Sequence, residues 1–174
     1  MSCVSRFIEL FQPFYQIKHY FVLIVIFCNT QFTDAKVFQV SNNQQIRKIM
    51  DQLQPGDTVL LAPGKWLDQQ LELIGEGTAF KPIVFAAKIP GSTIITGNSK
   101  LYLSGRHLVI KDLIFKEGNP NEGSVIQFRS KNEVPAFNCR LTNISISDYN
   151  PADDNIDTKY ISLYGSHNRV DHCS

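Results

Sequence analysis

The sequence has little net charge and lacks the short motifs that identify several large enzyme classes. Its 17 Lys and Arg residues nearly balance its 16 Asp and Glu residues, for a net charge of +1. Nucleic-acid-binding domains normally carry a clustered basic face, so this balance argues against nucleic acid as a partner. There is no Gly-rich phosphate loop after a strand, no G-x-S-x-G and no H-E-x-x-H, the motifs of nucleotide-binding proteins, α/β-hydrolases and zinc proteases. From these patterns no catalytic residue, substrate-binding residue or metal ligand can be assigned.

The N-terminal region has no hydrophobic run long enough to span a membrane. The apolar residues 20–28 follow Arg6 and Lys18, and they are far fewer than the roughly 20 that a transmembrane helix needs. A basic start, a short apolar run and small residues ending at Ala35 are typical of a secretory signal. We therefore expect residues 1–35 to be a signal peptide removed after Ala35, and the protein to be secreted or periplasmic without stable membrane insertion.

Cysteine is scarce, and cleavage of the signal would leave only Cys139 and Cys173. A lipid anchor at Cys28 is the alternative to simple cleavage, but the bulky Phe27 before it disfavours that processing. Two cysteines in a secreted chain could form a disulfide. Cys173, however, aligns with Ile144 in the repeat described below. We therefore expect Cys173 to be a buried small hydrophobic residue rather than half of a disulfide.

Helical periodicity is scarce after residue 57. Short apolar runs are instead separated by Gly, Pro and Asn, which favours strands joined by tight turns over alternating βαβ units. The runs cover residues 58–61, 70–74, 82–86, 93–95 and 101–103. The sequence therefore predicts an all-β protein.

A repeat of about two dozen to thirty residues organises these strands. Residues 169–174 align with residues 140–145, 29 positions earlier, and residues 141–146 align with residues 110–115, 31 positions earlier. Upstream, apolar positions recur at Leu60, Val84 and Val109. A period of 20–50 residues indicates a solenoid, and alternation within each copy indicates a strand. We expect stacked coils of a parallel β-helix over residues 58–174, with Ile110, Leu141 and Val170 side by side and the last coil incomplete.

One short helix is predicted before the first coil. Ser41 and Gln44 have the spacing of a capping box, and apolar residues follow on one helical face up to Leu53. The pattern predicts a lead-in strand and a helix from about residue 42 to residue 53 within the segment 36–57. Such a helix would cover the open end of a solenoid, with a partner-binding helix as the alternative.

Polar residues recur at one position of the repeat. Asp112, Asn143 and His172 are equivalent, and we interpret them as structural turn residues that face the stack rather than as ligands. For the same reason we discount the glycosylation sequon at residues 143–145. The histidines after the signal segment lack the spacing of metal ligands; they are His107, His167 and His172.

Two irregular segments interrupt the repeat, at residues 116–123 and 148–157. The second contains four aspartates and could bind Ca²⁺. It lacks the glycine and the terminal glutamate of a recognisable calcium loop, so an acidic surface loop is favoured. Arg129, Arg140 and Arg169 could line a groove for an anionic polymer, or could be solvated strand ends, and the sequence favours the second interpretation.

Residues 163–173, L-Y-G-S-H-N-R-V-D-H-C, preceded by residues 157–162, resemble a motif of the chondroitinase B and alginate lyase family of polysaccharide lyases. Four upstream segments resemble the opening coils of that family in the same order: residues 55–66, 81–85, 95–97 and 108–115. The resemblance covers essentially all of the chain after residue 35.

The resemblance implies a secreted enzyme with a right-handed parallel β-helix that cleaves uronate-containing polysaccharide, with alginate preferred over a glycosaminoglycan. In that family Ca²⁺, held by Asn and Glu, acidifies the proton beside the substrate carboxylate, and a Lys base assisted by an Arg removes it. The family's calcium ligands and catalytic residues follow the V-D-H-C motif at residues 170–173, so none is carried over to this chain. We expect an N-terminal part of a lyase that is inactive alone.

Two other functions are compatible with a β-helix. One is a pectin-type hydrolase or lyase, because a fold does not fix a function. The other is a non-catalytic solenoid that binds carbohydrate. The oligomeric state and endo or exo action cannot be derived from the sequence.

Overall fold

The computed structural model describes residues 34–153 and 155–174, and the compact unit is Asp34–Ser174. The predicted signal peptide falls almost entirely on residues 1–33, outside the described residues. No helix within the described ranges is long and apolar enough to cross a membrane.

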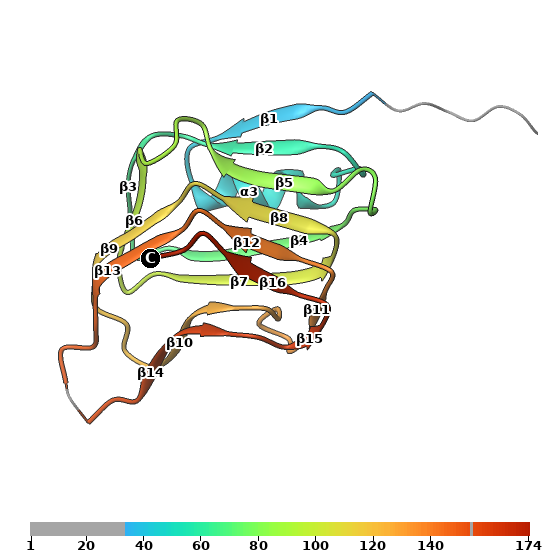
Figure 1. Cartoon of the computed structure of the whole chain (residues 1–174). Helices are drawn as coiled ribbons and strands as arrows, with labels where there is room; N and C mark the ends of the chain where they lie inside the picture. The colour runs from blue at the N-terminus through green and yellow to red at the C-terminus, as the bar shows by residue number, and fades with distance from the viewer. Residues whose placement is uncertain (1–33, 154) are drawn as a thin grey trace, which may run out of the picture. The chain divides into compact units, whose positions relative to one another are not determined.

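Three parallel sheets wind around one core (Figure 1). Sheet A contains β1 (Val37–Val40), β2 (Thr58–Leu61), β5 (Ile83–Ala87), β8 (Leu108–Lys111), β12 (Arg140–Thr142) and β16 (Arg169–Asp171). Sheet B contains β3 (Gly64–Leu67), β6 (Thr93–Gly97), β9 (Ile114–Gly118) and β13 (Ser145–Tyr149). Sheet C contains β4 (Gln70–Glu76), β7 (Lys100–Arg106), β10 (Gly123–Gln127), β11 (Ala136–Phe137), β14 (Thr158–Ser162) and β15 (Gly165–Ser166). Each coil visits A, B and C in turn, which confirms the predicted right-handed parallel β-helix.

The repeat read from the sequence sets the register of sheet A. Leu141 lies opposite both Ile110 and Val170, as expected. One upstream alignment was wrong: Leu60 lies opposite Ala86, while Val84 faces Thr58. A shift of two residues keeps every side chain on the same face of a strand, so the apolar pattern could not distinguish the two registers.

The core is built from columns of inward side chains, one from each coil. The column in sheet A consists of Phe38, Val59, Phe85, Ile110, Leu141 and Val170. Sheet C contributes Leu71 and Leu101, which are opposite each other and fully buried. Burial of each such side chain stabilises the fold by about 1.5–3 kcal/mol. The alternation of apolar and polar residues along the short strands therefore determines which side chains form the core.

The predicted helix is present as α3 (Asn43–Met50), three residues shorter at its C-terminal end than expected. Its cap is Asn42, whose side chain accepts a hydrogen bond from Gln45 N at 2.9 Å, while Gln45 Oε1 accepts from Ser41 N at 2.7 Å. The capping box is thus shifted by one residue from the Ser41–Gln44 pair, because Asn is also a strong cap. The Asn43 side chain donates to Gln70 O at 3.0 Å, so α3 covers the edge of β4.

The turn residues at the corner between sheets A and B are structural, as predicted, but two of the three face outward. Asp112, Asn143 and His172 all have left-handed backbones, with φ of 66°, 54° and 53°, a conformation that Asp, Asn and His tolerate better than most residues. The side chains of Asn143 and His172 are exposed, and Asn143 Nδ2 donates to Asp112 Oδ1 at 2.6 Å. The expectation that these residues face the stack was wrong for Asn143 and His172, because a single left-handed residue turns the chain with its side chain outside; the Asp112 side chain is only 12% exposed.

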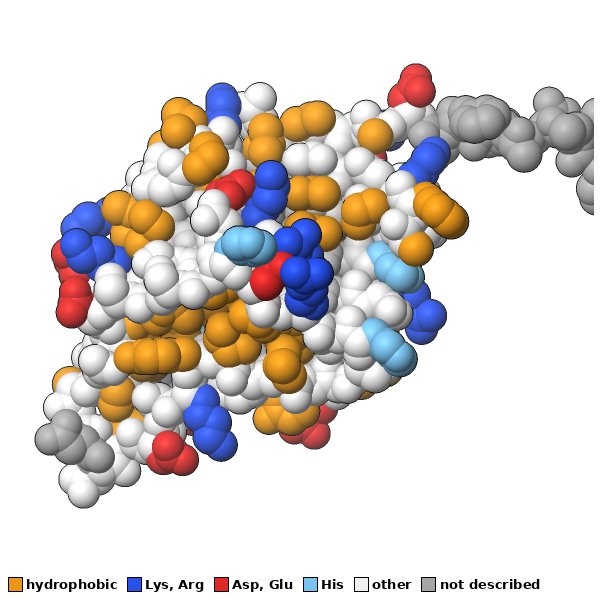
Figure 2. Space-filling model, in the orientation of Figure 1, with side chains coloured by type: hydrophobic (Ala, Val, Ile, Leu, Met, Phe, Trp, Pro, Cys, Tyr) orange, Lys and Arg blue, Asp and Glu red, His pale blue; other side chains and the backbone are white. Residues whose placement is uncertain are grey.

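Both cysteines in the described ranges are free: Cys139 is buried and Cys173 is exposed. The prediction of a buried Cys173 is therefore wrong. Its repeat partner Ile144 is buried because a further coil packs on it, whereas no described coil follows Cys173. Hydrophobic side chains are visible at this end of the stack, between sheet A and the strands β10 and β14 (Figure 2).

Tyr149 lies in the segment that the sequence indicated as an acidic surface loop, yet it is fully buried. Its hydroxyl donates to Ser99 O at 2.9 Å, and its ring meets Phe115 edge to face at 5.7 Å. Burial raises the pKa of Tyr149 to about 12. Gly118 leaves the space for this ring, because a Cβ there would overlap it. Tyr149 is thus the last residue of β13, and its side chain points into the core before the loop begins.

A column of small residues lets the coils approach closely at the end of sheet C. Gly105 lies opposite both Gly75 and Ala136, and Ala136 lies opposite Gly165. Gly105 has a positive φ of 98°, and a Cβ at this position would overlap the Gly75 carbonyl oxygen. This glycine is required both by its conformation and by the neighbouring backbone.

We predict that Gly105→Ala lowers the free energy of unfolding by at least about 2 kcal/mol more than Gly123→Ala. Gly123 also has a positive φ, of 59°, but no atom lies within 4 Å of the added Cβ, so it costs only the strain of about 1 kcal/mol. Urea unfolding of both variants measures the difference. Equal losses would show that the coils can separate at Gly105 without cost.

Candidate functional site

The structure does not bring the three candidate arginines together. Arg140 and Arg169 lie opposite each other on sheet A. Arg129 follows β10, at the edge of sheet C. A single groove lined by all three, one of the two interpretations of the sequence, is therefore excluded.

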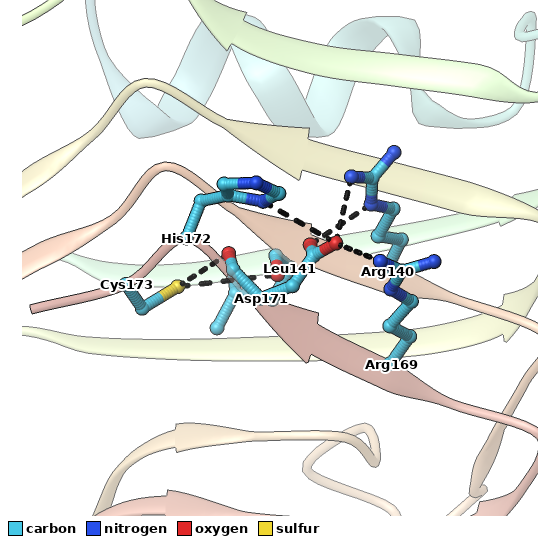
Figure 3. Close-up of polar contacts among 6 residues, drawn as sticks. All are labelled: Arg140, Leu141, Arg169, Asp171, His172 and Cys173. Atoms are coloured by element: carbon cyan, nitrogen blue, oxygen red, sulfur yellow. Dashed lines mark hydrogen bonds and ion pairs between the residues drawn. The ribbon is translucent and has the colours of Figure 1, made fainter.

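Arg140 and Arg169 converge on one carboxylate, that of Asp171 (Figure 3). Arg140 donates to it twice, at 2.9 and 2.8 Å, and Arg169 Nη2 lies 2.7 Å from Asp171 Oδ2. His172 Nδ1 is 3.4 Å from the same oxygen. The bonds from Arg140 lower the pKa of Asp171, because they favour the ionised carboxylate. This cluster ties β12 to β16, and its one carboxylate balances one of the two guanidinium charges, so it is a structural contact that leaves a net positive charge.

A shallow groove of about 640 Å³ crosses the outer face of sheet A. Its floor includes the outward side chains of Leu60, Val84 and Val109, and Lys111 and Arg140 lie toward one end. Figure 2 shows apolar side chains beside a cluster of charged and histidine side chains on this face. The groove contains the cations Lys88, Lys111 and Arg140, of which Arg140 is bound to Asp171 and Lys111 lies 3.5 Å from Asp112.

The outer face of sheet C carries the polar hollows. One hollow of about 220 Å³ is lined by Gly123, Ser124, Gln127, Arg129, Asp157, Lys159, Ser162 and Tyr164. The other, of about 210 Å³, is lined by Tyr102, Gln127, Arg129, Ser130, Lys131 and Glu133. Because the two share Gln127 and Arg129, we treat them as one surface, the sheet C groove.

A hairpin at residues 128–135, inserted between β10 and β11, forms one wall of the sheet C groove. Arg129 and Pro135 form an antiparallel bridge, and Ser130 N donates to Val134 O at 2.9 Å. Lys131 N donates to Glu72 Oε1 at 3.0 Å. Glu72 lies on β4, so this bond holds the tip of the hairpin across the outer face of β7. This insertion was not predicted from the sequence; the polar residues 130–133 were the available signal.

The hairpin presents two cations above tyrosine rings. The Arg129 guanidinium carbon lies 4.1 Å from the centre of the Tyr164 ring, and Lys131 Nζ lies 5.4 Å from that of Tyr102. Arg129 also donates to Gln127 Oε1 and to Glu133 Oε1, each at 3.1 Å. Burial, together with nearby carboxylates, raises the pKa of Tyr102. The groove thus combines fixed cations, aromatic faces and hydroxyl groups, which suits a polar, anionic ligand.

The acidic loop at residues 148–157, the candidate for Ca²⁺, includes Asp154, which lies outside the described residues. The described residues contain no group of three or more His, Cys, Asp or Glu side chains that could hold a metal ion. In the loop after β13, the Asp153 carboxylate accepts hydrogen bonds from both the backbone and the side chain of Asn155, at 2.9 and 2.8 Å. These bonds lower the pKa of Asp153 and account for the position of its carboxylate without a cation.

Comparisons with known proteins give one family. The family model described as Chondroitinase B matches residues 40–174. The solved structure of the PL6 family alginate lyase AlyGC is 32% identical with a TM-score of 0.75, covering 78% of this chain and 19% of that one. A mannuronic acid specific family 6 lyase from human gut microbiota is 30% identical with a TM-score of 0.70, covering 79% and 33%.

A third solved structure, the PL6 family polysaccharide lyase Pedsa3628 from Pseudopedobacter saltans, is 29% identical with a TM-score of 0.70, covering 78% and 30%. The chain therefore spans between about a fifth and a third of the length of these lyases. No curated protein sequence matches it.

We predict that Asp171→Asn removes a stabilisation that depends on pH. The folded-state pKa of Asp171 is lowered, so its contribution is fully present above the unfolded pKa of about 4 and is lost progressively as the pH falls from there through the lowered folded-state pKa. Asp171→Asn should be less stable than wild type near neutral pH, and the difference should shrink on acidification.

Urea unfolding at about pH 7, 5 and 3 measures this difference. Asp51→Asn is the matched control, since Asp51 is exposed and follows α3. A stability gap between wild type and Asp171→Asn that is the same at all three pH values would contradict the prediction.

Proposed function

Since the chain belongs to the chondroitinase B family of polysaccharide lyases, we propose that it forms the opening coils of an enzyme that cleaves uronate-containing polysaccharide by β-elimination. The observation that carries this proposal is the match of the family model over residues 40–174. That range includes every described coil. The same match favours a lyase of this family over a pectin-type enzyme.

Alginate is the substrate that we propose. Two of the similar solved structures are described as an alginate lyase and as a mannuronic acid specific lyase. The sheet C groove supports this choice, because Arg129 and Lys131 lie over tyrosine rings and Lys159 adds a third cation to the lining, against the two carboxylates of Glu133 and Asp157. Guanidinium groups recognise carboxylates through paired hydrogen bonds.

We assign binding, not bond cleavage, to this chain. β-Elimination requires removal of the proton on the carbon next to the uronate carboxylate, and in a calcium-dependent lyase the ion would neutralise that carboxylate. Among the described residues there is no group of three or more His, Cys, Asp or Glu side chains that could hold a metal ion, so no step through such an ion is assigned to them. We propose that coils beyond residue 174 of a longer protein carry the calcium ligands, the base and the assisting arginine.

Arg129 is the residue that we propose to contact the substrate carboxylate. Its guanidinium is held by Gln127, Glu133 and the ring of Tyr164, and its side chain is 29% exposed. Arg has five N–H donors, and only two of them are used in bonds to described residues. A fixed donor set at the junction of two hollows requires little ordering when a ligand binds.

We also propose that the protein is exported from the cytoplasm. The basic residues, the apolar run 20–28 and the small residues ending at Ala35 support this. Export would place the enzyme where large extracellular polysaccharides are found.

The activity is tested by comparing the 174-residue chain with the product of its gene read past codon 174. The longer protein should release unsaturated uronate ends from alginate, followed by their ultraviolet absorbance, and the 174-residue chain should release none. Dermatan sulfate serves as the alternative substrate. Turnover by the 174-residue chain alone would place catalytic groups in the described coils, and an inactive longer protein with further coils would refute the lyase proposal.

Arg129→Lys should weaken binding of an oligomannuronate to the 174-residue chain by about tenfold, because a lysine keeps the charge but not the paired donors. Titration calorimetry at low ionic strength measures the affinity, with a carboxyl-reduced, neutral oligomer as reference ligand. Arg106→Lys is the matched control, since Arg106 lies on sheet C, pairs with Glu76 and lines neither hollow. Equal affinities for the two variants would exclude Arg129 as the carboxylate contact.

A further inference from the structure

Asp57 is a buried carboxylate without a cationic partner among the described residues. Its exposed fraction is 0%, and none of the ion pairs within residues 34–153 and 155–174 includes it. A buried charge costs several kcal/mol unless it is paired or well hydrogen-bonded. The groups that contact this carboxylate therefore decide its role.

Two backbone N–H groups bind the Asp57 carboxylate. Gln54 N donates to Oδ2 at 2.9 Å, and Lys36 N donates to Oδ1 at 2.7 Å. The first bond closes the turn after the helix. The second joins residues 21 positions apart, and it holds the chain immediately before β1.

Lys36 is also the residue that would follow the cleavage site of the predicted signal peptide. Hydrolysis of the Ala35–Lys36 peptide bond adds one water molecule, leaves a carboxylate on Ala35 and converts the Lys36 nitrogen into an α-ammonium group. The atom that now donates to Asp57 as a neutral amide would then carry a positive charge.

We propose that a signal peptidase cleaves between Ala35 and Lys36, and that the α-ammonium group released on Lys36 forms a buried ion pair with Asp57. The proposal rests on the export proposed above and not on the lyase activity. Cleavage at this bond would supply the positive charge that Asp57 lacks. The contact between Lys36 and Asp57 therefore indicates both where the chain is processed and how processing changes the structure.

The surrounding structure is compatible with cleavage at this bond. Ala35 and Lys36 are both exposed, and they precede the first strand. Lys36 O accepts a hydrogen bond from Thr58 N at 2.8 Å, and Val37 lies opposite Thr58. The Lys36 main chain is therefore held at its nitrogen by Asp57 and at its carbonyl by Thr58, with no contribution from residues 34–35. All described strands and α3 begin at or after Val37, so the cleaved chain retains the whole described fold.

The alternative is that Asp57 only closes a turn between β1 and β2. In that case an amide nitrogen on Lys36 serves as well as an ammonium group, and the first residue of the processed chain has no special importance. A free amine and an acetylated amine at Lys36 distinguish the two, because acetylation keeps the N–H donor and removes the charge.

The first measurement uses the full chain. It is expressed in a bacterial host, and the N-terminus of the exported protein is determined by mass spectrometry. We expect Lys36. A mature protein that begins at any other residue, or one that is never cleaved, overturns the proposal.

The second measurement uses residues 36–174 with a free or an acetylated Lys36 nitrogen, each with Asp57 and with Asp57→Asn. The free amine should raise the equilibrium constant for folding about tenfold over the acetylated form when Asp57 is present, since charged hydrogen bonds are stronger than neutral ones. With Asp57→Asn this difference should vanish.

If Asp57→Asn prevents folding, the free and acetylated wild-type forms still test the pair. Equal stability of these two forms overturns the proposal whether or not the protein is exported. The lyase proposal is unaffected by either result, because it is judged by the release of unsaturated ends.

Discussion

The hydrogen bonds between successive coils are the constraint on which the rest of the structure depends. Each strand pairs in parallel with the equivalent strands before and after it, as in the sheet A order β1-β2-β5-β8-β12-β16. Side chains alternate across each strand, so a fixed register forces every coil to repeat its inward residues. The apolar columns, the turn positions and the small residues at close contacts all follow from this requirement.

The motif that identified the family is, in this structure, largely a device for stacking coils. Asn168 donates to Ala136 O at 2.8 Å and to Tyr164 O at 2.9 Å, and it accepts from Cys139 N at 3.0 Å. A Cβ at position 165 would overlap the Ala136 carbonyl oxygen, so only glycine fits there. The side chain of Asn168 thus binds backbone groups of the preceding coil and of its own coil beside the short β11–β15 pair. The motif therefore reports the fold more directly than it reports catalysis.

The sheet C groove, which we propose as the substrate contact, is an irregular feature on a regular scaffold. The strands beneath it repeat, whereas Arg129 and Lys131 come from an insertion that occurs in one coil. Their orientation depends on Glu72 from an earlier coil and on Tyr164 from a later one. Loops on rigid scaffolds commonly carry binding residues, and here the scaffold fixes the loop from both sides.

The sequence by itself determined the fold class and the register around Leu141, because a period of two within a longer repeat is a local pattern that burial alone explains. It also determined the presence of the helix α3, through a capping residue and one apolar helical face. It also indicated the family through residues 163–173. It could not place Tyr149 inside, separate Arg129 from the other two arginines, or pair Lys36 with Asp57. Those facts depend on which coil lies above another and on what an insertion contacts, and only the tertiary structure decides distances between residues that are far apart in the chain.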